Sequence, residues 1–282
     1  MSDGQPGPPF EPPLEDFFTP ESGVPSEVLR DACHGRSSLT CGYNCLFVNT
    51  PDGMAVIDTG LGASFLGYGE YIKPLVGQLE DGMTSAGLSR ANLAAVVFTH
   101  LHQDHSRGSI WSGELTFPAA TAYAHALEVA FWSGTVDLPQ AQPHLEAARE
   151  TIRLFGERLR AFEYEAEVLP GVRTLAAPGH TPGHSAVLLE SQGERLLCVG
   201  DTFYDPLQLT NPSWATPWDL DLAASIASRR HLLERAADER LMVHAYHLPF
   251  PGLGRVQRNG AAFTWHPLTL GMSDSPAPTT EH

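Results

Sequence analysis

The sequence of 282 residues predicts an α/β fold, and two observations support this prediction. Short apolar runs rich in β-forming residues alternate with longer segments in which apolar and charged residues recur at helical spacing. Several of the apolar runs also end close to histidine or aspartate, as the run over residues 93–98 does before His100. Because side chains at the ends of buried strands can converge outside the edge of a sheet, we expect a functional site there.

The N-terminal part of the chain predicts a flexible arm followed by a hairpin. Residues 1–22 are rich in proline, glycine and acidic residues, so they have little to bury. The aromatic residues that could anchor this arm to a neighbouring surface or to a second subunit are Phe10, Phe17 and Phe18. Two apolar runs, 45–49 and 54–58, then flank a Pro-Asp-Gly turn and predict a β-hairpin.

The remaining elements alternate along one domain, residues 23–272, up to a polar tail. The predicted helices cover residues 71–79, 124–131, 144–160 and 220–238. The predicted strands cover residues 93–98, 120–124, 168–175, 186–189, 195–199, 241–243 and 256–265. The residues expected on the solvated face of the last helix are Arg229, Arg230 and Arg235. Residues 273–282 are rich in proline and threonine, so we expect a disordered tail.

The composition restricts the partners of the protein. The formal net charge of −16 repels nucleic acid phosphates, so we expect no nucleic acid partner. No apolar run approaches the length of a membrane span, and residues 1–20 have neither the basic start nor the apolar core of a secretory signal. We therefore expect a cytoplasmic protein that acts on a small-molecule substrate and has no membrane partner.

The four cysteines do not form a metal-binding pattern. Cys41 and Cys45 have no matching second pair, as a zinc ribbon would need. We expect Cys33, Cys41, Cys45 and Cys198 to be buried free thiols, with a disulfide among the first three as the alternative.

The densest group of ligand-type residues follows the strand over residues 93–98. His100, His102, Asp104 and His105 lie within six consecutive positions. In an extended chain the side chains at i and i+2 point the same way, so His100 and His102 can bind one ion. If the chain then turns, Asp104 and His105 can face a second ion. Imidazole and carboxylate are the ligands that zinc takes in catalytic sites, where one position stays open for water.

This His-X-His-X-Asp-His pattern resembles the signature of the metallo-β-lactamase-fold hydrolases. Three further motifs support the resemblance in the expected order: Asp-Thr-Gly at 58–60, Gly-His-Thr-Pro-Gly-His at 179–184 and Gly-Asp at 200–201. The stretch His-Leu-Pro-Phe-Pro-Gly at 247–252 looks like the closing motif of the branch that includes methyl parathion hydrolase-like enzymes. The resemblance spans roughly residues 40–255. It implies an αββα sandwich, in which two mixed β-sheets are flanked by helices.

The resemblance also implies a complete set of metal ligands. One ion would be held by His100, His102 and His180, the other by Asp104, His105 and His247, and Asp201 would bridge the two. Asp58 is expected to support the site without binding metal. His184 is interpreted as a loop or supporting residue, and His244 is the alternative to His247. We leave His125 and His144 out of the site, because single histidines in helical segments are more often surface or packing residues.

Catalytic roles are assigned to Asp104 and Tyr204. Tyr204 lies three residues after Asp201. The lactonase branch of the superfamily has a tyrosine at this offset, where the phenol polarises the carbonyl of the substrate or protonates the leaving group. The alternative is a tyrosine that only packs at the rim of the pocket.

The function implied is a dinuclear metal-dependent hydrolase that uses a metal-bridging hydroxide on a small ester, lactone or phosphotriester. Zinc is the expected metal, with manganese, cobalt or iron as alternatives. Because members of the related branch are often dimers, a homodimer is also expected. Two alternatives stay open: a persulfide dioxygenase of the same fold with a single iron, and a scaffold without catalysis. A metal count would separate the dioxygenase from the hydrolase.

Overall fold

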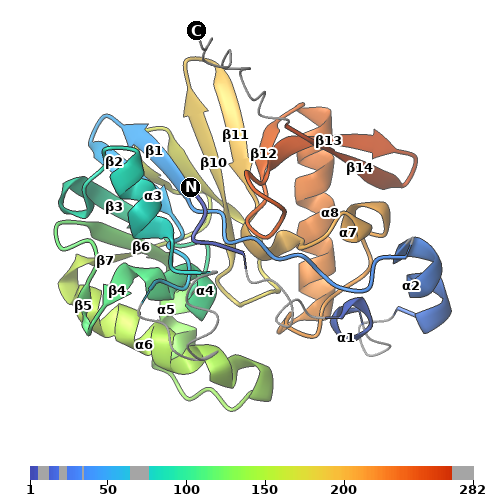
Figure 1. Cartoon of the computed structure of the whole chain (residues 1–282), viewed down its shortest axis with the longest axis horizontal. Helices are drawn as coiled ribbons and strands as arrows, with labels where there is room; N and C mark the ends of the chain where they lie inside the picture. Colours follow the sequence, from blue (N-terminus) through green and yellow to red (C-terminus); the bar gives the residue numbers. More distant parts are fainter. Residues whose placement is uncertain (6–12, 19–23, 34, 64–75, 269–282) are drawn as a thin grey trace, which may run out of the picture.

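The computed structural model describes residues 1–5, 13–18, 24–33, 35–63 and 76–268. Two mixed β-sheets form the centre of the described chain (Figure 1). The first sheet has the strand order β1-β2-β3-β6-β7, and the second has the order β14-β13-β12-β11-β10-β9-β8. A short ribbon of two strands, β4 and β5, lies outside both sheets.

The strands have the following bounds. Those of the first sheet are β1 (Leu46–Thr50), β2 (Gly53–Ile57), β3 (Leu93–Val97), β6 (Thr121–His125) and β7 (Leu159–Phe162). Those of the second sheet are β8 (Glu167–Leu169), β9 (Val172–Ala176), β10 (Ser185–Ser191), β11 (Glu194–Cys198), β12 (Met242–His244), β13 (Leu253–Asn259) and β14 (Ala262–Pro267). The ribbon strands are β4 (Ile110–Trp111) and β5 (Glu114–Leu115).

Alternating side chains pack the two sheets face to face. On β2, Ala55 and Ile57 join a buried cluster with Val187 of β10 and Cys198 of β11. The intervening residue Val56 points to the other side of its sheet, where it joins a second apolar cluster. Because successive side chains of a strand point to opposite faces, each sheet is buried on both sides. The near-continuous apolar runs in the sequence reflect this burial.

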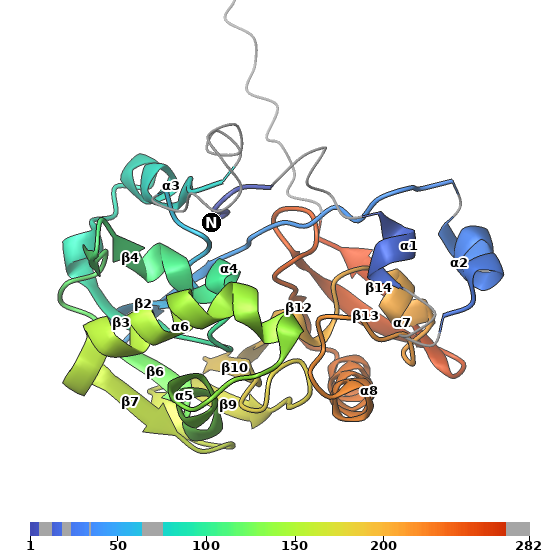
Figure 2. The ribbon, with the colours of Figure 1, turned by 90° about the horizontal axis from the view of Figure 1, so that it is seen from below.

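Eight α-helices accompany the sheets in the described part of the chain. They are α1 (Leu14–Phe17), α2 (Ser26–Cys33), α3 (Leu79–Ser85), α4 (Gln103–Ser106), α5 (Ala126–Ser133), α6 (Gln142–Phe155), α7 (Leu207–Thr210) and α8 (Leu222–Asp238). Residues of α3, α5 and α6 share an apolar cluster with the first sheet, and residues of α8 share one with the second (Figures 1 and 2). The predicted αββα sandwich is therefore confirmed. Across the described ranges, no helix combines the length and the apolar character that a membrane span needs.

Several predicted elements differ in their ends. The helix expected over 144–160 ends at Phe155, because Gly156 adopts a positive φ of 51° and the chain then continues into β7. The strand expected over 168–175 is the hairpin of β8 and β9, and Gly171 at its turn has a φ of 75°. The strand expected over 256–265 is likewise a hairpin, β13 and β14. Most of the helix expected over 71–79 lies outside the described residues, and α3 begins at Leu79.

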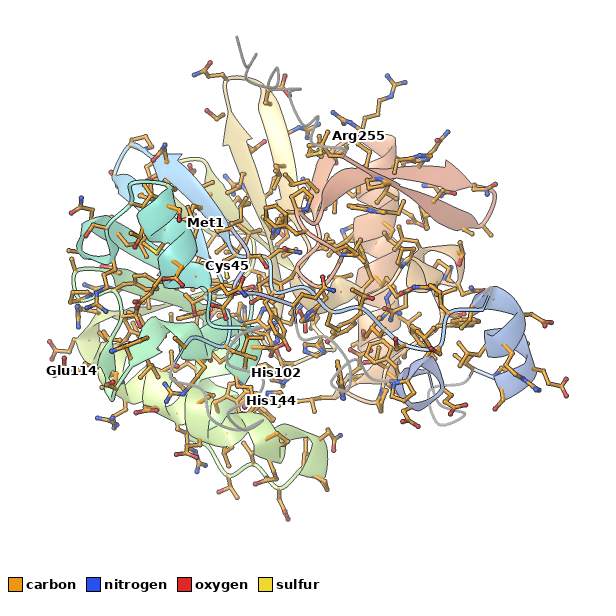
Figure 3. All side chains as sticks on the ribbon, in the orientation of Figure 1. Met1, Cys45, His102, Glu114, His144 and Arg255 are labelled. Carbon is orange, nitrogen blue, oxygen red and sulfur yellow. The ribbon has the colours of Figure 1, made fainter. Side chains whose placement is uncertain are left out.

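The described part of the N-terminal segment packs on the domain, which differs from the expected flexible arm. The amino group of Met1 donates to the carbonyl oxygen of Cys45 at 2.6 Å, and Figure 3 shows the two residues side by side. Phe17 and Phe18 are buried beside Tyr204 and Trp214. These two rings are covered by their own chain, so the predicted homodimer would need another surface. Phe10 and the tail 273–282 lie outside the described residues.

Two further expectations concern single side chains. Arg229 is buried, so its expected place on the solvated face of the last helix is wrong. Its guanidinium donates to the carbonyl oxygens of Thr202 and Trp214, and this pairing stabilises the loop that follows β11. All four cysteines lie in the described part of the chain, where they are buried and form no disulfide, as expected.

Candidate metal centre

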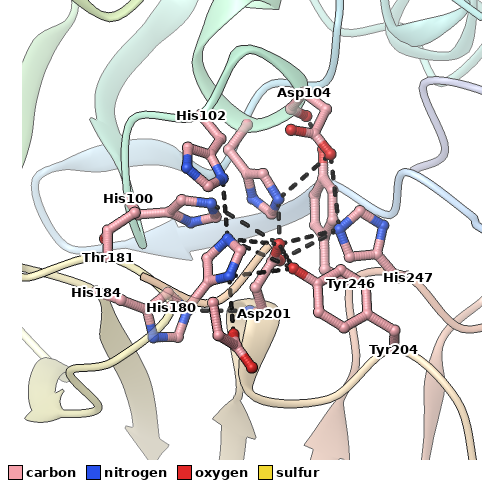
Figure 4. A network of polar contacts seen from close by, with 12 residues as sticks. His100, His102, Asp104, His180, Thr181, His184, Asp201, Tyr204, Tyr246 and His247 are labelled. Atoms are coloured by element: carbon pink, nitrogen blue, oxygen red, sulfur yellow. Dashed lines mark hydrogen bonds and ion pairs between the residues drawn. The ribbon is translucent and has the colours of Figure 1, made fainter. Parts of the chain in front are cut away.

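The His-X-His-X-Asp-His segment bridges the end of β3 and the start of α4. His102 has an extended backbone and directly precedes α4, so the chain turns there as the sequence suggested. Figure 4 shows Asp104, in the first turn of α4, directed toward the same centre as His100 and His102. His105 of the same helix lies in one ligand cluster with Asp104 and His247. The segment is tied to both sheets, because Ser185 of β10 donates its backbone N–H to Thr99 at 2.9 Å.

The second sheet supplies three residues from three separate strand ends. His180 lies in the loop between β9 and β10, Asp201 follows β11, and His247 follows β12. All three are buried, and Figure 4 shows them around one point with the histidines of the first sheet. The structure thus brings together every residue that was predicted to bind metal.

Asp201 lies at the middle of this group. Its carboxylate oxygens are 3.0 Å from Nε2 of His105 and 3.2 Å from Nε2 of both His180 and His247. Nε2 of His100 lies farther away, at 3.8 Å. One carboxylate therefore faces histidines of both predicted ligand sets.

Buried atoms without hydrogen bonds show that the centre fits a cation. Among the described residues, Nε2 of His100, His102 and His105 and Oδ1 of Asp201 are buried but make no hydrogen bond of normal geometry. Buried polar atoms are nearly always paired, so these atoms require a partner that is not a protein group. The two predicted ligand sets each form a cluster whose ligand atoms lie within 4.8 Å of one another: His100, His102, His180 and Asp201, and Asp104, His105 and His247. A third group with the same spacing is His102, Asp104 and His144, so His144, which we left out of the site, lies beside it. Imidazole and carboxylate donors in such clusters fit divalent transition metals.

The electrostatics of the centre also favour a cation. Burial lowers the pKa of His100 and His102 well below the usual value, so both are neutral imidazoles. Burial alone would lower the pKa of His105, but the carboxylates around it outweigh burial and raise that pKa. Burial would raise the pKa of Asp201, but the surrounding histidines outweigh it and keep that pKa well below its usual value. The carboxylates thus require positive charge at the centre, which a bound metal ion would supply.

Groups outside the clusters orient the histidines. His105 Nδ1 donates to Asp58 at 2.8 Å, and Asp58 also accepts from the backbone N–H and the hydroxyl of Thr99. Nδ1 of His180 lies 3.2 Å from Asp219, and Nδ1 of His247 lies 3.0 Å from the carbonyl oxygen of Gly42. Such contacts leave Nε2 free to bind metal. Asp58 holds the supporting position that the sequence suggested, whereas Asp219 carried no sequence signal.

His184 and His244, the further histidines of the two ligand motifs, lie in different surroundings. Both ring nitrogens of His184 are occupied: Nδ1 donates to the carbonyl oxygen of Ala177, and Nε2 accepts from the backbone N–H of Asp201. His184 therefore positions Asp201 and has no nitrogen left for a metal. His244 is buried in β12 and joins neither ligand cluster.

Glu128 of α5 connects the two loops that carry ligands, and the sequence analysis missed it. Its fully buried carboxylate accepts from the backbone N–H of Leu101 at 3.0 Å. It also accepts from the hydroxyl of Thr181 at 2.7 Å and from the backbone N–H of Gly183 at 3.1 Å. A single acidic residue in the otherwise apolar helix 126–133 is the signal that could have identified it.

A cavity of about 260 Å³ opens onto the centre. Its lining residues are Cys41, Tyr43, His102, Gln103, Asp104, Gln140, Pro143, His144, Asp201, Tyr204, Trp218 and His247. His144, which we left out of the site, stacks on His102 with ring centroids 3.8 Å apart. Burial lowers the pKa of His144 to about 4, so its ring is neutral. No sequence pattern distinguished His144 from an ordinary helix residue.

Tyr204 lies between the cavity and the ligand clusters. Its hydroxyl donates to Asp201 Oδ2 at 2.7 Å, and its ring stacks on His247 with centroids 4.8 Å apart. Phe17 and Trp218 pack edge-on against the same ring. The hydroxyl is therefore held at the floor of the cavity and not at its rim.

Comparisons with known proteins agree with this geometry. The family model described as the Metallo-beta-lactamase superfamily matches residues 39–247. An N-acyl homoserine lactonase from a Bacillus species is 26% identical over 202 residues, which cover 66% of this chain and 73% of the relative. A probable metallo-hydrolase of Mycobacterium tuberculosis is 27% identical over 206 residues, which cover 64% of each chain.

Solved structures share the fold at lower sequence identity. AidC, a dizinc quorum-quenching lactonase solved with a product, matches with a TM-score of 0.83 and 23% identity over 96% of this chain and 93% of AidC. A probable metal-dependent hydrolase from Staphylococcus aureus matches with a TM-score of 0.75 and 18% identity over 96% of this chain and 95% of that one. Both likenesses extend over nearly the whole chain.

Proposed function

The chain belongs to the metallo-β-lactamase superfamily and is a metal-dependent hydrolase, and from this premise we propose that it opens the ring ester of small lactones with two divalent metal ions bound. The position of Asp201 between two groups of ligand atoms carries this proposal. His100, His102 and His180 would hold one ion, and Asp104, His105 and His247 would hold the other. Asp201 would bridge them, and its negative charge would offset the repulsion between two dications.

The chemistry follows from the donor set and from Tyr204. When bound, two divalent ions supply a water activated at neutral pH and polarise the carbonyl oxygen of the ester. In the overall reaction the ring C–O bond breaks, the oxygen of water bonds to the carbonyl carbon, and a proton of water ends on the former ring oxygen. The Tyr204 hydroxyl at the cavity floor is placed to donate to the carbonyl oxygen or to the departing ring oxygen.

The cavity supports a small substrate. Its volume of about 260 Å³ lies slightly below the range of small-molecule sites, which starts at about 300 Å³. Tyr43, Trp218 and Pro143 give part of the lining apolar surface, against which an acyl or alkyl chain can pack. Because the Bacillus relative is an N-acyl homoserine lactonase, N-acyl homoserine lactones are the first substrates to test.

A substrate panel with parallel metal analysis tests the proposal. Purified metal-loaded protein is assayed for acid release with lactones, aryl esters and phosphotriesters, and dialysis against a chelator removes the metal. We expect the highest kcat/KM on a lactone, loss of activity in the chelated protein and recovery on addition of Zn²⁺. Activity confined to phosphotriesters, or lactone hydrolysis that persists without metal, would contradict it.

A further inference from the structure

We propose that Gln103, Gln140 and His144 form a subsite for a neutral amide group of the substrate, beside the ester that is cleaved. These three residues line the cavity at the metal centre and come from α4, from the 3-10 turn Pro139–Ala141 and from α6. The inference rests on the proposed lactone hydrolysis and specifies which lactones the site favours.

Gln103 provides the first observation. It lies between two predicted metal ligands in the sequence, and its side chain is only 8% exposed. Within the described structure its side-chain amide makes no hydrogen bond, although the residue lines the cavity. The amide atoms are not sealed from solvent and face the cavity, where a bound molecule can take the place of water as their partner. The Gln103 amide therefore has one donor group and one acceptor available for a bound molecule.

His144 offers a second group with a fixed orientation. Its ring lies nearly parallel to the ring of His102, at an interplanar angle of 19°, and Figure 3 shows the two residues next to each other. Nδ1 of His144 accepts from the backbone N–H of Gln103 at 3.3 Å. Because Nδ1 accepts this hydrogen bond, the ring carries its proton on Nε2. In the described part of the chain this N–H has no acceptor, so it can donate to a ligand in the cavity.

Gln140 completes the polar group at the entrance. It is exposed, and its side-chain amide has no hydrogen-bond partner within the described ranges. Pro139 precedes it and Pro143 follows it, and both restrict the backbone of this turn. The three residues thus offer several donors and two acceptors on rigid supports.

The charge of the lining selects a neutral group. Among the described residues that line the cavity none is lysine or arginine, whereas Asp104 and Asp201 both contribute carboxylates. A substrate that carries a carboxylate or phosphate outside its ester ring would therefore meet no lysine or arginine among these lining residues. A secondary amide has one donor and one acceptor, which match the carboxamide oxygens and the N–H groups of the subsite.

A matched pair of substrates tests the subsite. One lactone carries an acylamino group on the ring, and the other has a CH₂ group in place of the amide nitrogen with the same chain length. We expect the protein to prefer the amide by at least about tenfold in kcat/KM, because a site built for hydrogen bonding rejects an analogue that lacks the group. The variants Gln103→Leu and His144→Phe should each reduce this ratio by about tenfold. Gln257→Leu, an exposed glutamine of β13 outside the cavity lining, is the matched control and should keep the ratio.

Binding of a lactam analogue separates this inference from the proposed reaction. The lactam has the same acylamino group but no ester, and its dissociation constant is measured by calorimetry on metal-loaded protein whose metal content has been verified. Weaker binding by about tenfold in both variants, with tight binding by the control, supports the subsite even if no lactone is cleaved. Equal binding to all proteins, or lactone hydrolysis with no preference for the amide, would overturn it. If Gln103→Leu loses metal, Gln140→Leu together with His144→Phe decides.

Discussion

The two ligand groups of the metal centre differ in how far the protein covers them. His100, His102, His180 and Asp201 are all buried, with exposed fractions between 0% and 4%. In the other group His105 and His247 are equally buried, but the side chain of Asp104 is 18% exposed toward the cavity. The first group is therefore almost fully buried, although His102 and Asp201 line the cavity, whereas the second group has one ligand that is partly exposed there.

The hydrogen bonds that hold the ligand side chains in place also differ between the two groups. The histidines of both groups have partners at Nδ1, such as Asp219 for His180 and Asp58 for His105. The carboxylate of Asp104 has no hydrogen bond in the described structure; the histidine nitrogens near it are Nε2 of His247 at 3.6 Å and Nε2 of His105 at 3.8 Å. Because outer contacts of this kind strengthen metal binding, we expect the second group to hold its ion more weakly than the first.

Removal of Asp201 should have the largest effect, because this carboxylate serves both groups. We expect Asp201→Ala to weaken both ions and to reduce kcat/KM by more than about 10³-fold, beyond the loss of a single oxyanion donor. Metal content and lactone hydrolysis measured together check this. Normal activity in this variant would mean that the bridge is misassigned.

His247→Ala should enlarge the difference between the two groups, because it removes a ligand of the second group only. Loss of a residue that supports a ligand typically weakens metal binding by about 10–100-fold. Because His247→Ala removes a ligand itself, we expect a larger loss of affinity for the second ion. His244→Ala is the matched control: it removes a buried histidine of β12, and we expect lower thermal stability with normal metal content. Loss of metal in His244→Ala alone would reverse the assignment.

Tyr204→Phe separates chemistry from metal binding. The ring keeps its stacking on His247, but the donor next to Asp201 disappears. We expect kcat on lactones to fall by about 10²-fold with an unchanged metal content, in line with the loss of a well-placed donor. An unchanged kcat across the substrate panel would assign Tyr204 only to the wall of the cavity.

Of these substitutions, Glu128→Gln should have the smallest effect, and it should act on the first ligand group. All four hydrogen bonds of Glu128 are accepted by its carboxylate. Glutamine keeps the shape of the side chain, but its NH₂ group is a donor and would face donor groups in place of acceptors. We expect about a tenfold loss of affinity for the first ion, together with a loss of stability of about 1–3 kcal/mol. Metal titration and thermal unfolding check the two parts. Exposed Glu146 of α6 offers the control Glu146→Gln, which should change neither quantity.

The position of each ligand along the chain explains which residues of the centre could be predicted from the sequence. The four ligand-type residues His100, His102, Asp104 and His105 lie in one short segment, so their spacing alone indicated two ions. His180, Asp201 and His247 come from three strand ends of the second sheet, and they were placed through a resemblance to a family. Glu128, Asp219 and His144 were missed because their roles depend on which helices and loops the fold brings together. The end of α6 at Gly156 was missed because apolar spacing continues past it into β7.

Stepwise metal loading of the metal-free protein tests the central claim most directly. Zn²⁺ is added in increments, and bound metal per chain is measured after removal of excess ion, in parallel with lactone hydrolysis. The account predicts saturation at two ions per chain, with activity that appears mainly with the second ion, since the exposed group fills last. Saturation at one ion per chain, above all with iron preferred over zinc, would contradict it and favour the single-iron dioxygenase.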